Sequence, residues 1–106
     1  MELCADVLNT GLHLAMEWGA KWLEPIQERL KQLHPELTLE QLDNYDSTCR
    51  AAMKRGHDLV PECLGGDFDT EKAFPKWKRR MREAYPWISD ENLDRNFSQG
   101  CYYAMK

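Results

Sequence analysis

The chain has 106 residues, of which 18 are acidic and 14 are basic, and its formal net charge is −4. This length is typical of one domain, and the acidic balance argues against a protein that binds nucleic acid or an anionic membrane with its whole surface. No apolar run approaches the roughly 20 residues of a membrane span. Because no basic region precedes the first apolar residues, we expect no signal peptide and predict a cytoplasmic location.

Hydrophobic periodicity predicts a first helix over residues 2–23 and a second over residues 25–34. Gly11 and Gly19 interrupt the first pattern, and each costs about 1 kcal/mol relative to alanine inside a helix. Pro25 suits the first position of the second helix, where a missing N–H costs little. The apolar stripe of this second helix consists of Ile26, Leu30 and Leu33.

An internal repeat follows, because residues 34–43 match residues 85–94 at a constant offset of 51. Each copy has a proline that ends the preceding helix, a hydroxyl side chain that caps the next helix, and an apolar pair with the spacing of a hydrophobic staple. The matched residues are Pro35 and Pro86, Leu37 and Ile88, Thr38 and Ser89, and Leu42 and Leu93. We therefore predict two tandem helical hairpins, over residues 26–54 and 77–106.

The pattern also predicts three longer helices, over residues 39–55, 70–85 and 90–106. Gly56 should end the first of these, and Thr70 should cap the second. The long connection over residues 56–69 contains apolar residues, including Phe68, that should pack against the protein. The core-facing positions include Leu39, Leu42, Cys49, Leu93 and Cys101. The predicted fold is all-α: a single domain of five helices, formed by an N-terminal helix and two duplicated hairpins.

The cysteines give little indication of chemistry. They form no C-x-x-C pair, so we expect reduced thiols and no metal or cofactor. His57, Asp58 and Cys63 lie in the predicted connection and could form a base, an acid and a nucleophile. A thiol is activated only when its base lies within hydrogen-bond reach, and the chain has no catalytic motif or phosphate-binding loop. An enzyme is therefore the third hypothesis.

The sharpest local departure in the sequence is a basic run. Residues 71–82 contain six basic residues and one acidic residue, so this segment carries +5 and the rest of the chain carries −9. Trp77 and Met81 are four residues apart and should anchor this helix to the core, which leaves most of the basic side chains outside. The run is either a surface that binds phosphate or an acidic partner, or a solvated face whose charges pair with acidic helices.

Large aromatic residues are numerous for a chain of this length, and Trp and Tyr are enriched at the centres of protein interfaces. These residues are Trp18, Trp22, Trp87, Tyr102 and Tyr103. The leading hypothesis is a small non-enzymatic interaction module, such as a regulator, adaptor or inhibitor, that binds another protein. The alternative is binding of nucleic acid or another anion through the basic helix 76–82. The candidate binding residues are Lys76, Lys78, Arg79, Arg82, Trp87, Tyr102 and Tyr103.

Overall fold

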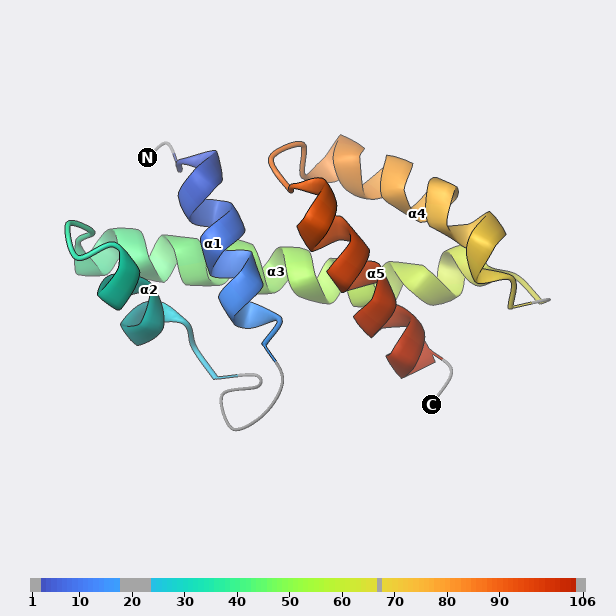
Figure 1. Cartoon of the computed structure of the whole chain (residues 1–106), viewed down its shortest axis with the longest axis horizontal. Coiled ribbons are helices and arrows are strands. Elements are labelled where there is room, and N and C mark those ends of the chain that lie inside the picture. Colours follow the sequence, from blue (N-terminus) through green and yellow to red (C-terminus); the bar gives the residue numbers. More distant parts are fainter. Residues whose placement is uncertain (1–2, 18–23, 67, 105–106) are drawn as a thin grey trace. The chain divides into compact units, whose positions relative to one another are not determined.

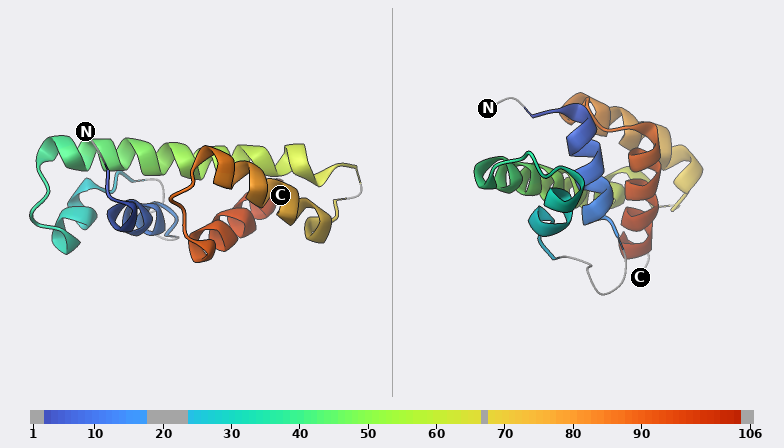
Figure 2. Two further views of the ribbon diagram at one scale, coloured as in Figure 1. Left: turned by 90° about the horizontal axis from the view of Figure 1, so that it is seen from above. Right: turned by 60° about the vertical axis from the view of Figure 1, so that its left-hand side comes forward.

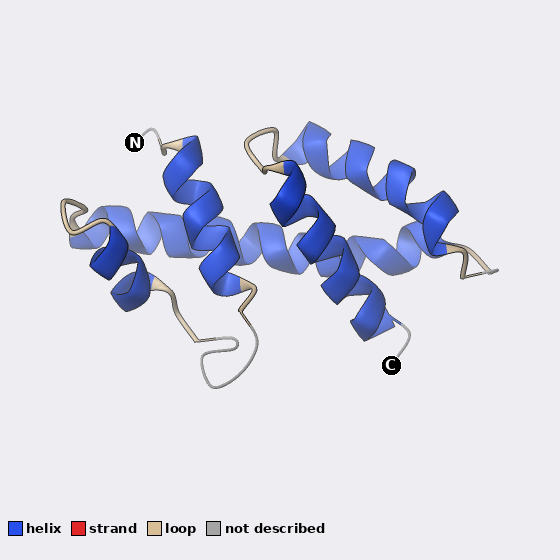
Figure 3. Ribbon diagram, viewed as in Figure 1, coloured by secondary structure: helices blue, strands red, loops and turns tan. Residues whose placement is uncertain are grey.

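A computed structural model describes residues 3–17, 24–66 and 68–104. Those residues form five α-helices and no strand, which confirms the all-α prediction (Figure 3). The helices are α1 (Ala5–Ala15), α2 (Gln27–Leu33), α3 (Leu39–Leu64), α4 (Thr70–Ala84) and α5 (Asp90–Ala104). The chain divides into two compact units, unit 1 over Met1–Met53 and unit 2 over Lys54–Lys106, so α3 contributes its first part to unit 1 and its last part to unit 2.

In unit 1, α1 packs closely on the first part of α3 (Figure 1). A Cβ atom at Gly11 would lie 2.8 Å from the Cys49 sulfur, so glycine is what allows this approach. The Cys49 thiol donates a hydrogen bond to the Leu8 carbonyl at 3.2 Å. The hydroxyl of Tyr45 accepts a hydrogen bond from the Cys4 amide at 2.9 Å. These contacts tie the residues from Cys4 to Gly11 to the first part of α3.

The short helix α2 depends on tertiary contacts, because seven residues cannot form a stable helix alone. Ile26 is fully buried, and its amide donates to the buried Asp46 carboxylate at 3.0 Å. Arg29 donates to the Leu14 carbonyl at 3.1 Å. The third residue of the predicted stripe, Leu33, is 58% exposed, which differs from the prediction, because α2 ends there and the chain turns away.

Unit 2 consists of the last part of α3 together with α4 and α5 (Figure 2). Its core forms around the fully buried Trp77, whose ring centroid lies 5.1 Å from that of Phe97. Leu93 is also fully buried, as predicted. A Cβ atom at Gly100 would lie 2.5 Å from a Val60 methyl carbon, which shows how closely α5 packs on α3.

The turns that follow α2 and α4 have the same backbone geometry. His34 has φ −132° and ψ 71°, and Tyr85 has φ −135° and ψ 72°. In each turn the amide three residues further on, of Leu37 or Ile88, donates to the carbonyl of that residue at 3.2 Å. The turns predicted at the two prolines are therefore present.

Both hydroxyl caps predicted after these turns are also present. The Gln41 amide donates to the Thr38 hydroxyl at 3.1 Å, and the Gln41 side chain accepts from the Thr38 amide at 2.8 Å, which completes a capping box. The Asn92 amide donates to the Ser89 hydroxyl at 3.2 Å. Leu39, predicted to face the core, is 77% exposed instead, because it is the first residue of α3 and lies beside the cap.

Helix α3 ends later than predicted. Gly56 does not stop it: the glycine is buried inside α3, its carbonyl accepts a hydrogen bond from Trp77 Nε1 at 2.9 Å, and the Asn96 side chain occupies the place of a Cβ. The helix continues through Pro61 and is followed by Gly65, whose φ of 67° is the left-handed conformation expected at a helix C-terminus. The predicted connection 56–69 is thus helical over its first nine residues.

Further boundaries differ from the predictions. Helix α1 covers Ala5–Ala15 rather than 2–23; residues 2 and 18–23 of that prediction lie outside the described residues. Helix α2 begins at Gln27, after the N-cap Ile26, and not at Pro25. The cap of α4 is Asp69 and not Thr70, because the Asp69 carboxylate accepts from the amides of Glu71 at 3.0 Å and Lys72 at 3.2 Å. The neighbouring Phe68, predicted to pack down, is 60% exposed and has a φ of 53°.

Candidate interaction surface on α4

The orientation of α4 is fixed by two buried side chains. Trp77 and Met81 are both fully buried, as their four-residue spacing predicted. Because they define the inner side of the helix, Lys76 and Arg79 are exposed on its outer side. Lys78 lies at the boundary and is half-buried.

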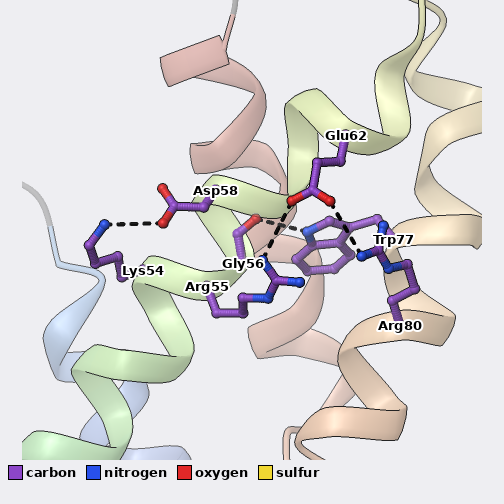
Figure 4. Close-up of polar contacts among 7 residues, drawn as sticks. All are labelled: Lys54, Arg55, Gly56, Asp58, Glu62, Trp77 and Arg80. Carbon is purple, nitrogen blue, oxygen red and sulfur yellow. Dashed lines mark hydrogen bonds and ion pairs between the residues drawn. The ribbon is translucent and has the colours of Figure 1, made fainter.

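Helix α4 is also tied to α3 through polar contacts (Figure 4). Trp77 Nε1 donates to the Gly56 carbonyl, and Glu62 of α3 lies between two arginines, at 3.4 Å from Arg80 and 3.5 Å from Arg55. Arg80 is therefore directed toward α3. These contacts hold α4 as a rigid support for the remaining basic side chains.

One carboxylate forms ion pairs with two basic side chains of α4. Asp90, the first residue of α5, lies 3.4 Å from Lys78 Nζ and also pairs with the Arg82 guanidinium. Lys72, near the start of α4, lies 3.9 Å from the Asp69 carboxylate. Because Asp90 carries one negative charge and meets two positive charges, this cluster keeps an excess of positive charge.

Lys76 and Arg79 differ from the other basic residues of the run. Both are exposed, and neither forms an ion pair with any residue that the structure describes. They are three positions apart, so they lie on the same side of the helix. Four of the six basic residues in 71–82 therefore have an ion-pair partner, two of them sharing Asp90, whereas Lys76 and Arg79 have none among the described residues.

A shallow, open groove of about 490 Å³ lies on α4 beside Arg79. We call it the α4 groove; its lining residues are Pro75, Lys78, Arg79, Arg82 and Glu83. Lysine and arginine have long aliphatic stems below their charged ends, so the floor is largely apolar and the rim is charged. The Lys78 ammonium lies 5.5 Å from the Phe74 ring centroid, a cation–π geometry that helps to hold it in place.

The aromatic candidates that the structure describes do not line this groove. Trp87 is half-buried on the turn between α4 and α5, where its ring lies 6.3 Å from that of Tyr85. Tyr102 and Tyr103 are 56% and 38% exposed, but they belong to the opposite end of α5 from Asp90, roughly 18 Å along the helix axis. The remaining aromatic candidates, Trp18 and Trp22, lie outside the described residues.

The structure does not assemble the proposed catalytic set. His57, Asp58 and Cys63 all lie on α3, and six helical residues separate His57 from Cys63 by about 9 Å along the axis. His57 Nε2 lies 3.2 Å from the Gln99 side-chain oxygen, and burial lowers the pKa of His57 despite that hydrogen bond. Asp58 pairs with Lys54 at 3.1 Å, and Cys63 is buried. The base and the nucleophile are thus on different sides of one helix.

Sequence reasoning missed the most important partner of the basic residues, Asp90. One signal was available: at the repeat offset, the first copy has the apolar Leu39 where the second has Asp90. A carboxylate at this position departs from the repeat, and only the short connecting turn separates it from the end of the basic helix. Glu83 and Pro75, which line the groove, were also missed as site residues.

Comparison with known proteins assigns no family to this chain. No protein-family model, no curated protein and no solved structure matches it. Within residues 3–17, 24–66 and 68–104, no group of three or more His, Cys, Asp or Glu side chains could hold a metal ion. No helix in the same ranges combines the length and the apolar character that a membrane span needs.

Proposed function

We propose that this protein is a small non-enzymatic interaction module that binds another protein through the outer side of α4. The observation that carries the proposal is the pair Lys76 and Arg79, two exposed cations without an ion pair among the described residues. They lie on a helix whose other side is fixed by the buried Trp77. A rigid helix that presents free charge beside an apolar floor is suited to binding rather than to chemistry.

A protein partner is favoured over nucleic acid for two reasons. Glu83 lines the α4 groove and Asp90 pairs with two of its cations, so negative charge is mixed with the positive charge. A nucleic-acid surface needs a continuous row of cations to neutralise successive phosphates. The apolar floor of the groove would also make no favourable contact with phosphates. Binding of nucleic acid through the basic helix 76–82 is the second candidate.

We also propose that the hairpins 26–54 and 77–106 are two copies of one structural element in a five-helix bundle. The equal backbone angles at His34 and Tyr85 support this. At the same offset, the first copy has Pro25, Gln27 and Glu28 in place of Lys76, Lys78 and Arg79. The basic surface would then belong to the second copy alone, while the first copy keeps the same helical framework.

The proposal is tested by a matched pair of charge reversals, Arg79→Glu and Arg95→Glu. Both arginines are exposed, both belong to helices of unit 2, and neither has an ion pair among the described residues. Wild type and both variants are immobilised, and the proteins that they capture from an extract of the native host are quantified by mass spectrometry at low salt. We expect Arg79→Glu to lose the specifically captured protein roughly 5- to 30-fold, a change of about 1–2 kcal/mol, and Arg95→Glu to keep it.

Equal capture by Arg79→Glu and wild type would contradict the proposal. Captured material that disappears on nuclease treatment, and whose binding falls steeply with salt, would favour the nucleic-acid alternative instead. Unchanged helical circular-dichroism signals of both variants serve as the control for folding, since neither substitution removes an ion pair.

A further inference from the structure

We infer that the α4 groove takes a carboxylate-rich peptide segment with interspersed aliphatic side chains, and that Asp90 is an internal competitor for its cations. This inference rests on the proposed function, since it names the partner class and the regulation of the same surface. The observation behind it is that one carboxylate of this chain, that of Asp90, already occupies two of the groove cations, Lys78 and Arg82. The bound carboxylate shows which chemistry these cations accept.

The geometry of the cations explains why a carboxylate binds there. Lys78 and Arg82 are four residues apart on α4, so their side chains project from neighbouring turns and can converge on one anion. The Lys78 ammonium lies over the Phe74 ring, and the Lys78 side chain is 32% exposed, so these contacts restrict where the ammonium can lie. Arg79 lies between them in sequence and has no carboxylate of its own among the described residues. An incoming acidic segment therefore finds one open cation and two that Asp90 holds.

Asp90 is held in a way that permits displacement. Its side chain is 69% exposed. Exposed ion pairs contribute little free energy because water and salt screen them, so a second carboxylate can replace Asp90 at small cost. The apolar floor of the groove then gives the incoming segment a contact that Asp90 does not make, through the stems of Arg79 and Arg82 and the ring of Pro75. The segment must combine carboxylates with aliphatic side chains to use both features.

Two substitutions distinguish competition by Asp90 from a general effect of its charge: Asp90→Asn and Glu83→Gln. Each removes one negative charge at the groove and keeps the side-chain shape. Among the residues described, only Asp90 forms ion pairs with groove cations, and Glu83 lines the groove without an ion pair. The full chain is titrated with a fluorescent synthetic peptide of Glu, Leu and Ala, with a Gln-for-Glu peptide, and with a single-stranded oligonucleotide.

We expect Asp90→Asn to bind the Glu peptide roughly 1.5- to 5-fold more tightly than Glu83→Gln does, the range that corresponds to one exposed ion pair. The Gln-for-Glu peptide should bind neither variant. In the wild type, the NMR signal of the Asp90 carboxyl carbon should shift as the Glu peptide is added, and this second measurement does not depend on how Asp90→Asn folds.

Each other outcome is decisive. If Asp90→Asn and Glu83→Gln strengthened peptide binding equally and the Asp90 carboxyl signal did not move, competition by Asp90 would be overturned. The proposed function would still stand in that case, provided that Arg79→Glu weakened binding. Tighter binding of the oligonucleotide than of the Glu peptide would overturn the partner class. If the Glu peptide bound neither wild type nor Arg79→Glu, the partner class would be overturned, and the capture experiment with Arg79→Glu would still decide the proposed function. Equal binding of the Glu peptide to wild type and Arg79→Glu would overturn the placement of the site on this surface.

Discussion

At the scale of single residues, burial distinguishes two cysteines that were both predicted to face the core. Cys49 has no exposed surface and donates to the Leu8 carbonyl, as its predicted core position requires. Burial, with the nearby Asp46 carboxylate as a second cause, raises the pKa of the Cys49 thiol to about 12. Cys101 was predicted to face the core as well, but it is only half-buried, and burial raises the pKa of its thiol too.

We predict that iodoacetamide at mildly alkaline pH modifies Cys4 in the native protein and leaves Cys49 unmodified until the chain unfolds. The thiolate is the reactive form, Cys4 is exposed, and Cys49 stays protonated well below pH 12. Mass spectrometry of digested samples, taken with and without urea, measures this. Modification of Cys49 at the rate of Cys4 without urea would contradict the packing of α1 on α3.

The raised pKa of Cys49 also predicts the direction in which the free energy of unfolding changes with pH. Between pH 9.0 and about 12 the unfolded chain has lost the Cys49 proton and the folded chain has not. Because the folded state then binds more protons, the contribution of Cys49 to the free energy of unfolding is complete below pH 9.0 and decreases as pH rises toward about 12.

At the scale of elements, the sequence predicted the turns and helix caps that depend on local chemistry. The turns at Pro35 and Pro86 and the caps at Thr38 and Ser89 depend on neighbouring residues only, so they were found. The end of α3 was not predicted correctly. A glycine normally favours the end of a helix, unless tertiary contacts outweigh the conformational free energy that glycine costs inside it. Here Gly56 is where Trp77 and Asn96 meet α3, and no local pattern contains that information.

The same division applies to the α4 surface. The buried Trp77 and Met81 could be predicted from spacing, and the exposure of Lys76 and Arg79 followed from them. The ion pairs of Asp90 were not predicted, because they depend on how the turn after α4 brings the start of α5 back to the end of α4.

We predict unequal costs for two substitutions, one at the cap of α5 and one inside it. Ser89→Ala should lower the free energy of unfolding by roughly 0.5–2 kcal/mol, because it removes the acceptor of the Asn92 amide. Leu93→Ala should cost about 2–5 kcal/mol, because Leu93 is fully buried. Urea denaturation measures both. The matched controls are Ser98→Ala and Leu39→Ala, at exposed positions, which should be nearly neutral; a Leu93→Ala variant as mild as Leu39→Ala would contradict the core of unit 2.

At the scale of the whole molecule, two exposed surfaces are candidates for the proposed binding site. One is the α4 groove with Lys76, and the other is the pair Tyr102 and Tyr103, whose rings lie 5.6 Å apart, with His57 beside them at 5.2 Å from Tyr103. Tyrosine pairs are common at interfaces. Among the described residues, nothing beside the tyrosine pair specifies a partner, whereas the α4 groove combines one open cation, Arg79, with an apolar floor and a carboxylate already bound. For this reason we place the binding function on α4.

The most direct test of that placement is an amide NMR titration of the full chain with the Glu, Leu and Ala peptide. If the α4 groove is the binding site, the largest shift changes will fall on the amides of Arg79, Arg82, Glu83 and Asp90, and they will disappear in Arg79→Glu. Amides near Tyr102 and Tyr103 will then move little. Shift changes centred on Tyr102 and Tyr103, with those four amides unmoved, would contradict the account and assign binding to the aromatic surface.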